Sequence, residues 1–251
     1  MTSWAAQKRA QYIGTLIVVV GIVGGGVLFF VVRDKPTCTD GIQNGTEEGV
    51  DCGGECQAIC PFAATAPVIQ WTRFFEQAPG VYSVVALIEN PNSKASAMAV
   101  PYEFSLRDEN NVLIYERKGQ VNLLARQRIP IFESGLVTGN RIPRRAAFSF
   151  TKSPEWVTDT PQDIPLRISQ ENLVTGDTEQ RLSARVRNTE LAALSDVRIV
   201  ALLFSADGNA VAASQTVIDF LPGSGEKDIV FSWQAPFAET IVKIDLVPVL
   251  R

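Results

Sequence analysis

The stretch Val100-Pro101-Tyr102-Glu103-Phe104-Ser105-Leu106 alternates large apolar residues with smaller or polar ones. Such period-two alternation is typical of a β-strand with one face in a hydrophobic core. The pattern returns at residues 182–187 and 242–246, and turn sequences such as Asn90-Pro91-Asn92 separate the strands. The sequence therefore predicts that nearly all of residues 62–251 is β structure.

This β region is predicted to be duplicated. Sliding the chain by 98 residues places Ala86 on Ala184, Asn90 on Asn188 and Tyr102 on Val200 without a gap. A second match, at an offset of 83, places residues 148–150 on residues 231–233, and it predicts 15 extra residues in the first copy, around residues 126–145. Units of this size predict two Ig-like antiparallel β-sandwiches. We expect modules at 62–164 and 165–251, each able to fold alone.

The first copy resembles a known domain family. Residues 104–108 (F-S-L-R-D) fit the F-x-L-Y-D signature of the FxLYD domain, with Arg107 in place of the tyrosine. The flanking segments 85–92 (V-A-L-I-E-N-P-N) and 110–114 (N-N-V-L-I) are similar to those of FxLYD and the related late-embryogenesis β-sandwiches. The second copy has a similar pattern of apolar and turn residues at 201–209 but lacks the residues of the signature. The resemblance implies an anchored bacterial cell-envelope protein without known activity.

Residues 12–32 form a run of 21 residues without a charge. At a rise of 1.5 Å per residue, a helix of this length spans ~32 Å, enough for a ~30 Å hydrocarbon core. The run therefore predicts a transmembrane helix, with the lipid bilayer as its partner. A cleaved signal peptide is the alternative, but the run ends in Phe29-Phe30-Val31-Val32-Arg33 rather than in the small residues of a cleavage site.

The cysteines indicate the orientation of this helix. All four follow it, and an even number of cysteines in a Gly- and Asp-rich loop predicts two disulfides in an oxidising compartment, with the pairing left open. Residues 1–11 are then cytoplasmic, and residues 33–61 form a stalk outside the cytoplasmic membrane. The pattern is similar to a small Cys-rich module of bacterial surface and secreted proteins (C-x-D-G-x2-N … V-D-C-G-G-x-C). The four residues are Cys38, Cys52, Cys56 and Cys60.

The cysteine segment is also acidic, because residues 36–61 contain five Asp or Glu residues and no Lys or Arg. We predict no cofactor, with calcium as the open alternative, since carboxylate and amide oxygens around glycine turns are hard ligands. A zinc site on the four cysteines is a further alternative. The weak calcium candidates are Asp40, Asn44, Glu47, Glu48 and Asp51.

Composition excludes several functions. The chain has no histidine, which removes the commonest general base and the Ser-His-Asp and His-x-x-x-His types of site. A net charge of −4 argues against nucleic acid as a partner. Two groups could still bind ligands, but a solvated loop is favoured for the first and core packing for the second. They are the basic set Arg126, Arg128, Arg141, Arg144 and Arg145, and the aromatic set Trp71, Phe74, Phe75, Tyr82, Trp156 and Trp233.

These observations together predict a single-pass membrane protein with its N-terminus inside and its C-terminal modules outside. Its expected role is interaction or scaffolding in the cell envelope, without catalysis, with another envelope protein or a second copy of itself as partner. The alternative is a surface module that binds carbohydrate or peptidoglycan.

Overall fold

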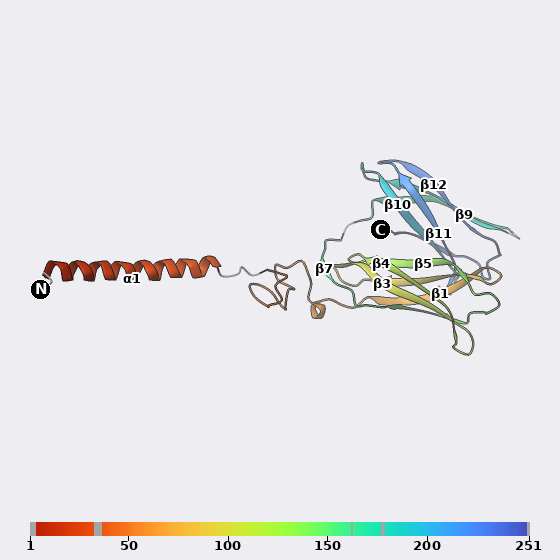
Figure 1. The fold of residues 1–251 in the computed structure, drawn as a ribbon. Helices are drawn as coiled ribbons and strands as arrows, with labels where there is room; N and C mark the ends of the chain where they lie inside the picture. Colours follow the sequence, from red (N-terminus) through yellow and green to blue (C-terminus); the bar gives the residue numbers. More distant parts are fainter. Residues whose placement is uncertain (1–3, 33–36, 162, 177–178, 250–251) are drawn as a thin grey trace. The chain divides into compact units, whose positions relative to one another are not determined.

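The computed structural model describes residues 4–32, 37–161, 163–176 and 179–249 (Figure 1). Residues in strands far outnumber helical residues in the described part of the chain, which confirms the mainly β prediction. The chain divides into two compact units, Met1–Glu55 and Cys56–Arg251. Each unit is described by itself below.

The first unit contains the only long helix of the described residues, α1 (Trp4–Val32), which includes the predicted span 12–32. Its 21-residue window Gln7–Val27 has a mean hydropathy of 1.8, and none of that window is buried within the described structure. An uncovered apolar helix presents a surface that water solvates poorly. By length and composition it is a candidate membrane span or signal sequence.

The first sandwich of the second unit consists of two antiparallel sheets, in the orders β1-β2-β5 and β4-β3-β6, with β7 paired to the start of β3. A short 3-10 turn, η1 (Pro61–Ala63), precedes it. The strands are β1 (Val68–Ala78), β2 (Val81–Glu89), β3 (Ala95–Arg107), β4 (Leu113–Leu123), β5 (Arg128–Val137), β6 (Arg145–Phe150) and β7 (Val157–Thr158).

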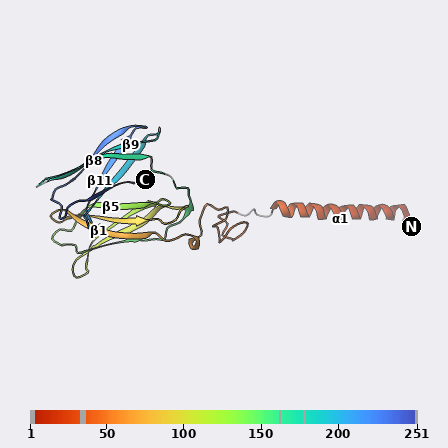
Figure 2. The ribbon, with the colours of Figure 1, turned by 180° about the vertical axis from the view of Figure 1, so that it is seen from behind.

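The second sandwich has sheets in the orders β8-β9-β12 and β11-β10-β13, again with antiparallel pairing. Figure 2 shows it stacked on the first sandwich. The strands are β8 (Leu166–Thr175), β9 (Gln180–Asn188), β10 (Leu194–Phe204), β11 (Ala210–Leu221), β12 (Glu226–Trp233) and β13 (Lys243–Val249). The fold class expected from the sequence, an apolar helix followed by two tandem sandwiches, is confirmed.

The two sandwiches share one topology, because β1 to β6 pair in the same order as β8 to β13. Their equivalent strands β1 and β8, β5 and β12, and β6 and β13 each begin 98 residues apart. The prediction of a second offset of 83 is therefore wrong, since it matches β6 with β12, which are not equivalent. Residues 126–145 are no insertion; they contain β5, the counterpart of β12.

The gapless alignment also fails inside β10. In β3 the core residues include Tyr102 and Phe104, whereas in β10 they include Ile199 and Ala201, which is an offset of 97. A shift of one residue moves every side chain of a strand to its other face. Val200, which the alignment places on the core residue Tyr102, therefore lies outside the core of its own sandwich.

The face of β10 that carries Val200 packs against the first sandwich. Val200 and Leu202, each 1% exposed, form a buried cluster with Val85 of β2 and Ala213 of β11. This third cluster is separate from the core of either sandwich. Both faces of β2 and β10 are consequently buried, and the two sandwiches share one hydrophobic interface.

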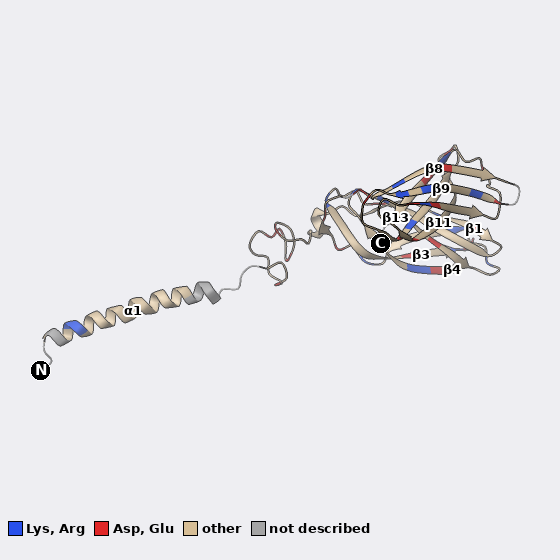
Figure 3. Ribbon diagram, turned by 90° about the horizontal axis from the view of Figure 1, so that it is seen from above, with Lys and Arg blue, Asp and Glu red and all other residues tan. Residues whose placement is uncertain are grey.

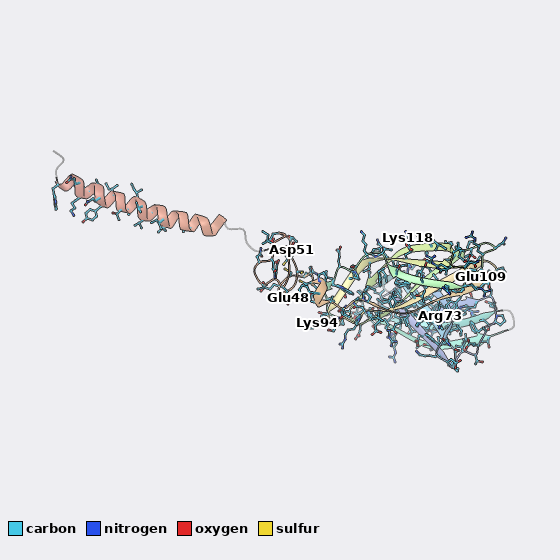
Figure 4. The ribbon with its side chains drawn as sticks, turned by 90° about the horizontal axis from the view of Figure 1, so that it is seen from below. Glu48, Asp51, Arg73, Lys94, Glu109 and Lys118 are labelled. Carbon is cyan, nitrogen blue, oxygen red and sulfur yellow. The ribbon has the colours of Figure 1, made fainter. Side chains whose placement is uncertain are left out.

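Polar and aromatic contacts border this interface. The Trp71 ring meets the Phe204 ring edge-on, with 6.5 Å between the centroids. Arg73, two residues along β1 (Figure 4), donates a hydrogen bond of 2.9 Å from its Nη2 to the Asn209 Oδ1. Edge-to-face pairs contribute roughly 0.5–1.5 kcal/mol beyond their buried area.

Each sandwich is tied at one end by a buried asparagine. The Asn90 Nδ2 donates to the carbonyl oxygens of Ala95, Leu123 and Leu124 at 2.8, 3.2 and 3.0 Å. Asn188, the residue 98 positions later, donates to the carbonyl oxygens of Ala192 and Pro222 at 2.8 and 3.1 Å. The two side chains are 1% and 0% exposed. Each connects a turn to the chain following the next hairpin, so this part of the repeat is reproduced in detail.

Candidate functional site

The cysteine segment is held together covalently. All four cysteines are disulfide-bonded, so the two predicted disulfides are present. Disulfide sulfurs are not the thiolates that zinc requires, which excludes the four-cysteine zinc alternative in this state. Gly54 has a φ of +60°, and a side chain there would overlap the Thr46 carbonyl oxygen. The tight path of this loop therefore requires glycine.

The carboxylates predicted as calcium candidates accept hydrogen bonds from the backbone of this loop. Both Asp51 carboxylate oxygens accept from the Gly41 N–H at 3.1 and 3.0 Å, and the Glu47 Oε2 accepts from the N–H groups of Asn44 and Asp51. Glu48 is exposed, and its side chain accepts no hydrogen bond from the described residues (Figure 4). These oxygens stabilise the turns of the loop.

Asp40 has the most hydrogen bonds of these acids. The Asn44 side chain, followed by the Thr37 and Ile42 N–H groups, lowers the pKa of Asp40 below its usual value of 3.8. A lowered pKa means that the charged form stabilises the fold above pH 3.8, and that this contribution is lost as the pH falls further. Acid should therefore loosen the first turn of the loop.

We expect a chelator to leave this loop unchanged and a reductant to open it. With a Glu-specific protease, EDTA should not alter the cleavage rate after Glu47, Glu48 or Glu55, because backbone hydrogen bonds already use the carboxylates. Reduction should raise this cleavage rate about 10-fold or more, while the β unit, Cys56–Arg251, resists the protease. Mass spectrometry should show four hydrogens fewer than in the reduced chain. Faster cleavage in EDTA alone would instead establish calcium.

The end of the cysteine segment belongs to the β unit. Ile59 N–H donates to the Trp156 carbonyl at 2.8 Å, and Thr158 N–H donates to the Gln57 carbonyl at 2.8 Å. Cys60 is completely buried. Residues 57–59 thus run beside β7 and belong to the same unit as the first sandwich.

The structure divides the predicted basic set. Arg126 precedes β5 and Arg128 begins it, whereas Arg141 follows its end and Arg145 begins β6. A strand of this length spans about 30 Å. All of the set is exposed, and Figure 3 shows both signs of charge over the strands. The side chains therefore do not form one anion-binding face, and the solvated interpretation holds.

The predicted aromatic set is used in packing. Trp156 and Trp233 are 6% and 8% exposed, and the Trp233 Nε1 donates to the Ala213 carbonyl. Phe74 meets Tyr82 edge-on at 6.0 Å, and Trp71 packs on Phe204. No tryptophan of the β unit offers a flat exposed face within the described residues. The preferred interpretation, core and strand-end packing, is confirmed.

A polar cavity of about 550 Å³ lies where the two sandwiches meet. This volume falls within the roughly 300–1,000 Å³ typical of small-molecule sites. Strands β3, β4 and β5 supply one wall, and β10, β11 and β13 supply the other. The polar residues that line it are Tyr102, Lys118, Gln120, Asn122, Glu133, Arg198 and Gln215.

The floor of the cavity is a fixed hydrogen-bond network. The Tyr102 O–H donates to the Glu133 Oε1 at 2.7 Å, and the Arg117 Nε donates to the Glu133 Oε2 at 3.0 Å. Burial, with the Glu133 bond and charge, raises the pKa of Tyr102, so its phenol stays protonated at physiological pH. A side chain on Gly119 would overlap this phenol, which explains the glycine in β4.

Sequence reasoning missed this cavity and its charged residue Arg198. Arg198 lies in β10 between the core residues Val197 and Ile199. An arginine inside an otherwise apolar strand run, V-R-I-V-A-L-L-F, was the available signal. Glu133 gave no comparable signal, because its role depends on a tyrosine from the other sheet.

Comparisons with known proteins give little. No family model and no curated protein matches the chain. Solved structures with partial likeness include red sea bream transglutaminase (10% identity, 72% of this chain and 31% of that one, TM-score 0.24). A glycoside hydrolase family 2 beta-glucuronidase has 10% identity over 86% of this chain and 29% of that one, with a TM-score of 0.25.

A third likeness is to the tandem CBM22 domains of Paenibacillus barcinonensis Xyn10C, with 11% identity over 74% of this chain and 86% of that one, and a TM-score of 0.16. The chain spans about a third of the length of the first two structures. Scores this low carry no argument about function. The FxLYD resemblance stays a prediction.

Proposed function

We propose that this protein is anchored in a cytoplasmic membrane by α1 and acts outside it as an interaction or scaffold protein of the cell envelope, without catalysis. The observation that carries this proposal is a 21-residue apolar helical window that nothing in the described structure buries, in one chain with four disulfide-bonded cysteines. Disulfides persist in oxidising compartments, so they support an outer location for the residues after the helix.

The absence of catalysis is part of the proposal. Several carboxylates of the described β unit are in ion pairs with arginine or lysine, such as Arg185–Asp228 and Lys118–Glu103. Paired exposed charges of this kind maintain a soluble surface. A partner protein or a second copy is the expected ligand of such a surface.

Topology tests the proposal directly. A reporter that fluoresces only in the cytoplasm, fused after Arg251, should stay dark, while the same reporter before Met1 should fluoresce. As a matched control, Ile17→Lys with Val20→Lys should abolish insertion and restore the C-terminal signal, because each lysine opposes insertion by about 3 kcal/mol. Fluorescence from the unsubstituted C-terminal fusion would overturn the orientation.

A second candidate function is favoured by the cavity between the sandwiches. Its Tyr102, Glu133 and amide side chains converge on a space large enough for a small ligand, which is how proteins orient polar molecules. We propose carbohydrate binding as this second function, compatible with membrane anchoring.

A further inference from the structure

Arg198 is the one cation of the cavity wall whose charge is not matched within the described part of the chain. Glu133 is paired with Arg117, and Lys118 is paired with Glu103 and Glu116 at 3.4 and 3.0 Å. No hydrogen bond or ion pair involves the Arg198 guanidinium among the described residues, and its Nε is inaccessible to solvent. A buried donor without a partner is unfavourable by roughly 1–3 kcal/mol, and more when charged.

The position of Arg198 directs this unmatched charge toward the cavity. Its strand partners are Val217 of β11 and Val249 of β13, which offer no acceptor side chain. Its positive charge reaches Tyr102 on the opposite wall of the cavity, where it acts to lower the pKa of the phenol. Val200, two residues on along the same face, is sealed in the interface. The free space beside the guanidinium is therefore the cavity.

The remaining lining defines what else a ligand needs. The Tyr102 hydroxyl already donates its hydrogen bond to Glu133. The phenol oxygen and the Glu133 carboxylate can therefore act toward a ligand as acceptors of further hydrogen bonds. The Gln120 and Gln215 amides both donate and accept. Such a lining suits a molecule with several hydroxyl groups, and a planar guanidinium suits a carboxylate, which it can bind through two parallel hydrogen bonds.

We propose that the cavity binds a uronic acid unit of a saccharide, with its carboxylate on Arg198 and its hydroxyls toward Tyr102 and Glu133. This inference rests on the second candidate function and names its ligand class. It is independent of membrane anchoring. The single carboxylate balances the single unmatched cation, and the hydroxyls use the acceptors of the opposite wall.

Ligand-observed NMR titrations of the full chain in lipid nanodiscs test this inference. The probes are sodium D-glucuronate and D-galacturonate, with D-glucose and sodium acetate as controls for the ring and for the charge. Both uronates should bind at least about 10-fold more tightly than glucose or acetate. Arg198→Gln should weaken uronate binding about 10-fold or more, as for loss of a charged hydrogen bond. Arg167→Gln, an exposed arginine of β8, should leave it unchanged.

Tyr102→Phe serves as a second variant, because it keeps the core ring and removes only the hydroxyl. It should weaken uronate binding about 3- to 10-fold. Uronate binding that Arg198→Gln leaves intact would overturn the inference while the carbohydrate function stands. Acetate binding as tight as that of glucuronate would overturn the saccharide class. If no sugar binds, both this inference and the second function fail, and the topology experiment still decides the anchor.

Discussion

Replacing Asn90 with Asp should lower the free energy of unfolding by about 3–5 kcal/mol, the usual range for an uncompensated buried charge. The substitution removes the donors to three carbonyl oxygens and aims a negative charge at them in a site that is 1% exposed. Asn188→Asp should have a similar effect, because it faces two carbonyl oxygens in the second sandwich. Urea unfolding of the full chain measures the loss.

The control for this experiment is Asn140→Asp, at an exposed turn between β5 and β6. That variant should stay within about 0.5 kcal/mol of the unsubstituted protein. The deficit of Asn90→Asp should shrink at acid pH, because a protonated carboxyl is neutral and can donate one hydrogen bond. An equal loss in both variants would show that Asn90 does not hold the turn in the way described.

Val200→Asp should be the second large effect, also about 3–5 kcal/mol, because it places a charge in the interface cluster where Val200 is 1% exposed. Val200 belongs to neither sandwich core, so the circular dichroism of the β-strands should persist. Trp71 should lose its contact with Phe204 and become exposed to water. Its fluorescence emission should therefore shift to longer wavelength.

Val230→Asp is the matched control, since this valine of β12 is 40% exposed. It should change stability by about 0.5 kcal/mol or less and leave the fluorescence unchanged. The Val200 variant also tests whether each module folds alone. Loss of the β-strand signal together with the fluorescence shift would show that the sandwiches depend on one another, against the expectation for fragments 62–164 and 165–251.

The strands were predictable because alternation depends on local sequence alone. Val100 to Leu106 lies in β3 as expected, and Asn90 and Asn188 are equivalent as the repeat predicted. The register of β10 was not predictable from the alignment. One residue more or fewer in a turn moves every side chain of the following strand to the opposite face of its sheet, while the composition of the strand stays the same. The register is set only by pairing with the neighbouring strands.

The interface between sandwiches could have been anticipated in part. Ile199 to Phe204 and Val84 to Ile88 are continuous apolar runs, which are typical of strands buried on both faces. The cavity could not have been anticipated, because Glu133, Tyr102 and Arg198 come from three different sheets and meet only after the sandwiches pack. The acidic loop shows a different limit, because its composition does not reveal which backbone N–H groups its carboxylates accept from.

The stacking of two sandwiches with the same topology has a geometric consequence. The contact joins the β1-β2-β5 sheet of one copy to the β11-β10-β13 sheet of the other, and these are not equivalent sheets. A head-to-tail contact of this kind does not close on itself, so in principle further copies could add at both ends. The two end sheets instead carry charge pairs, Lys118–Glu103 and Arg185–Asp228. These charges oppose burial of the two outer sheets, as the polar caps of repeat arrays do.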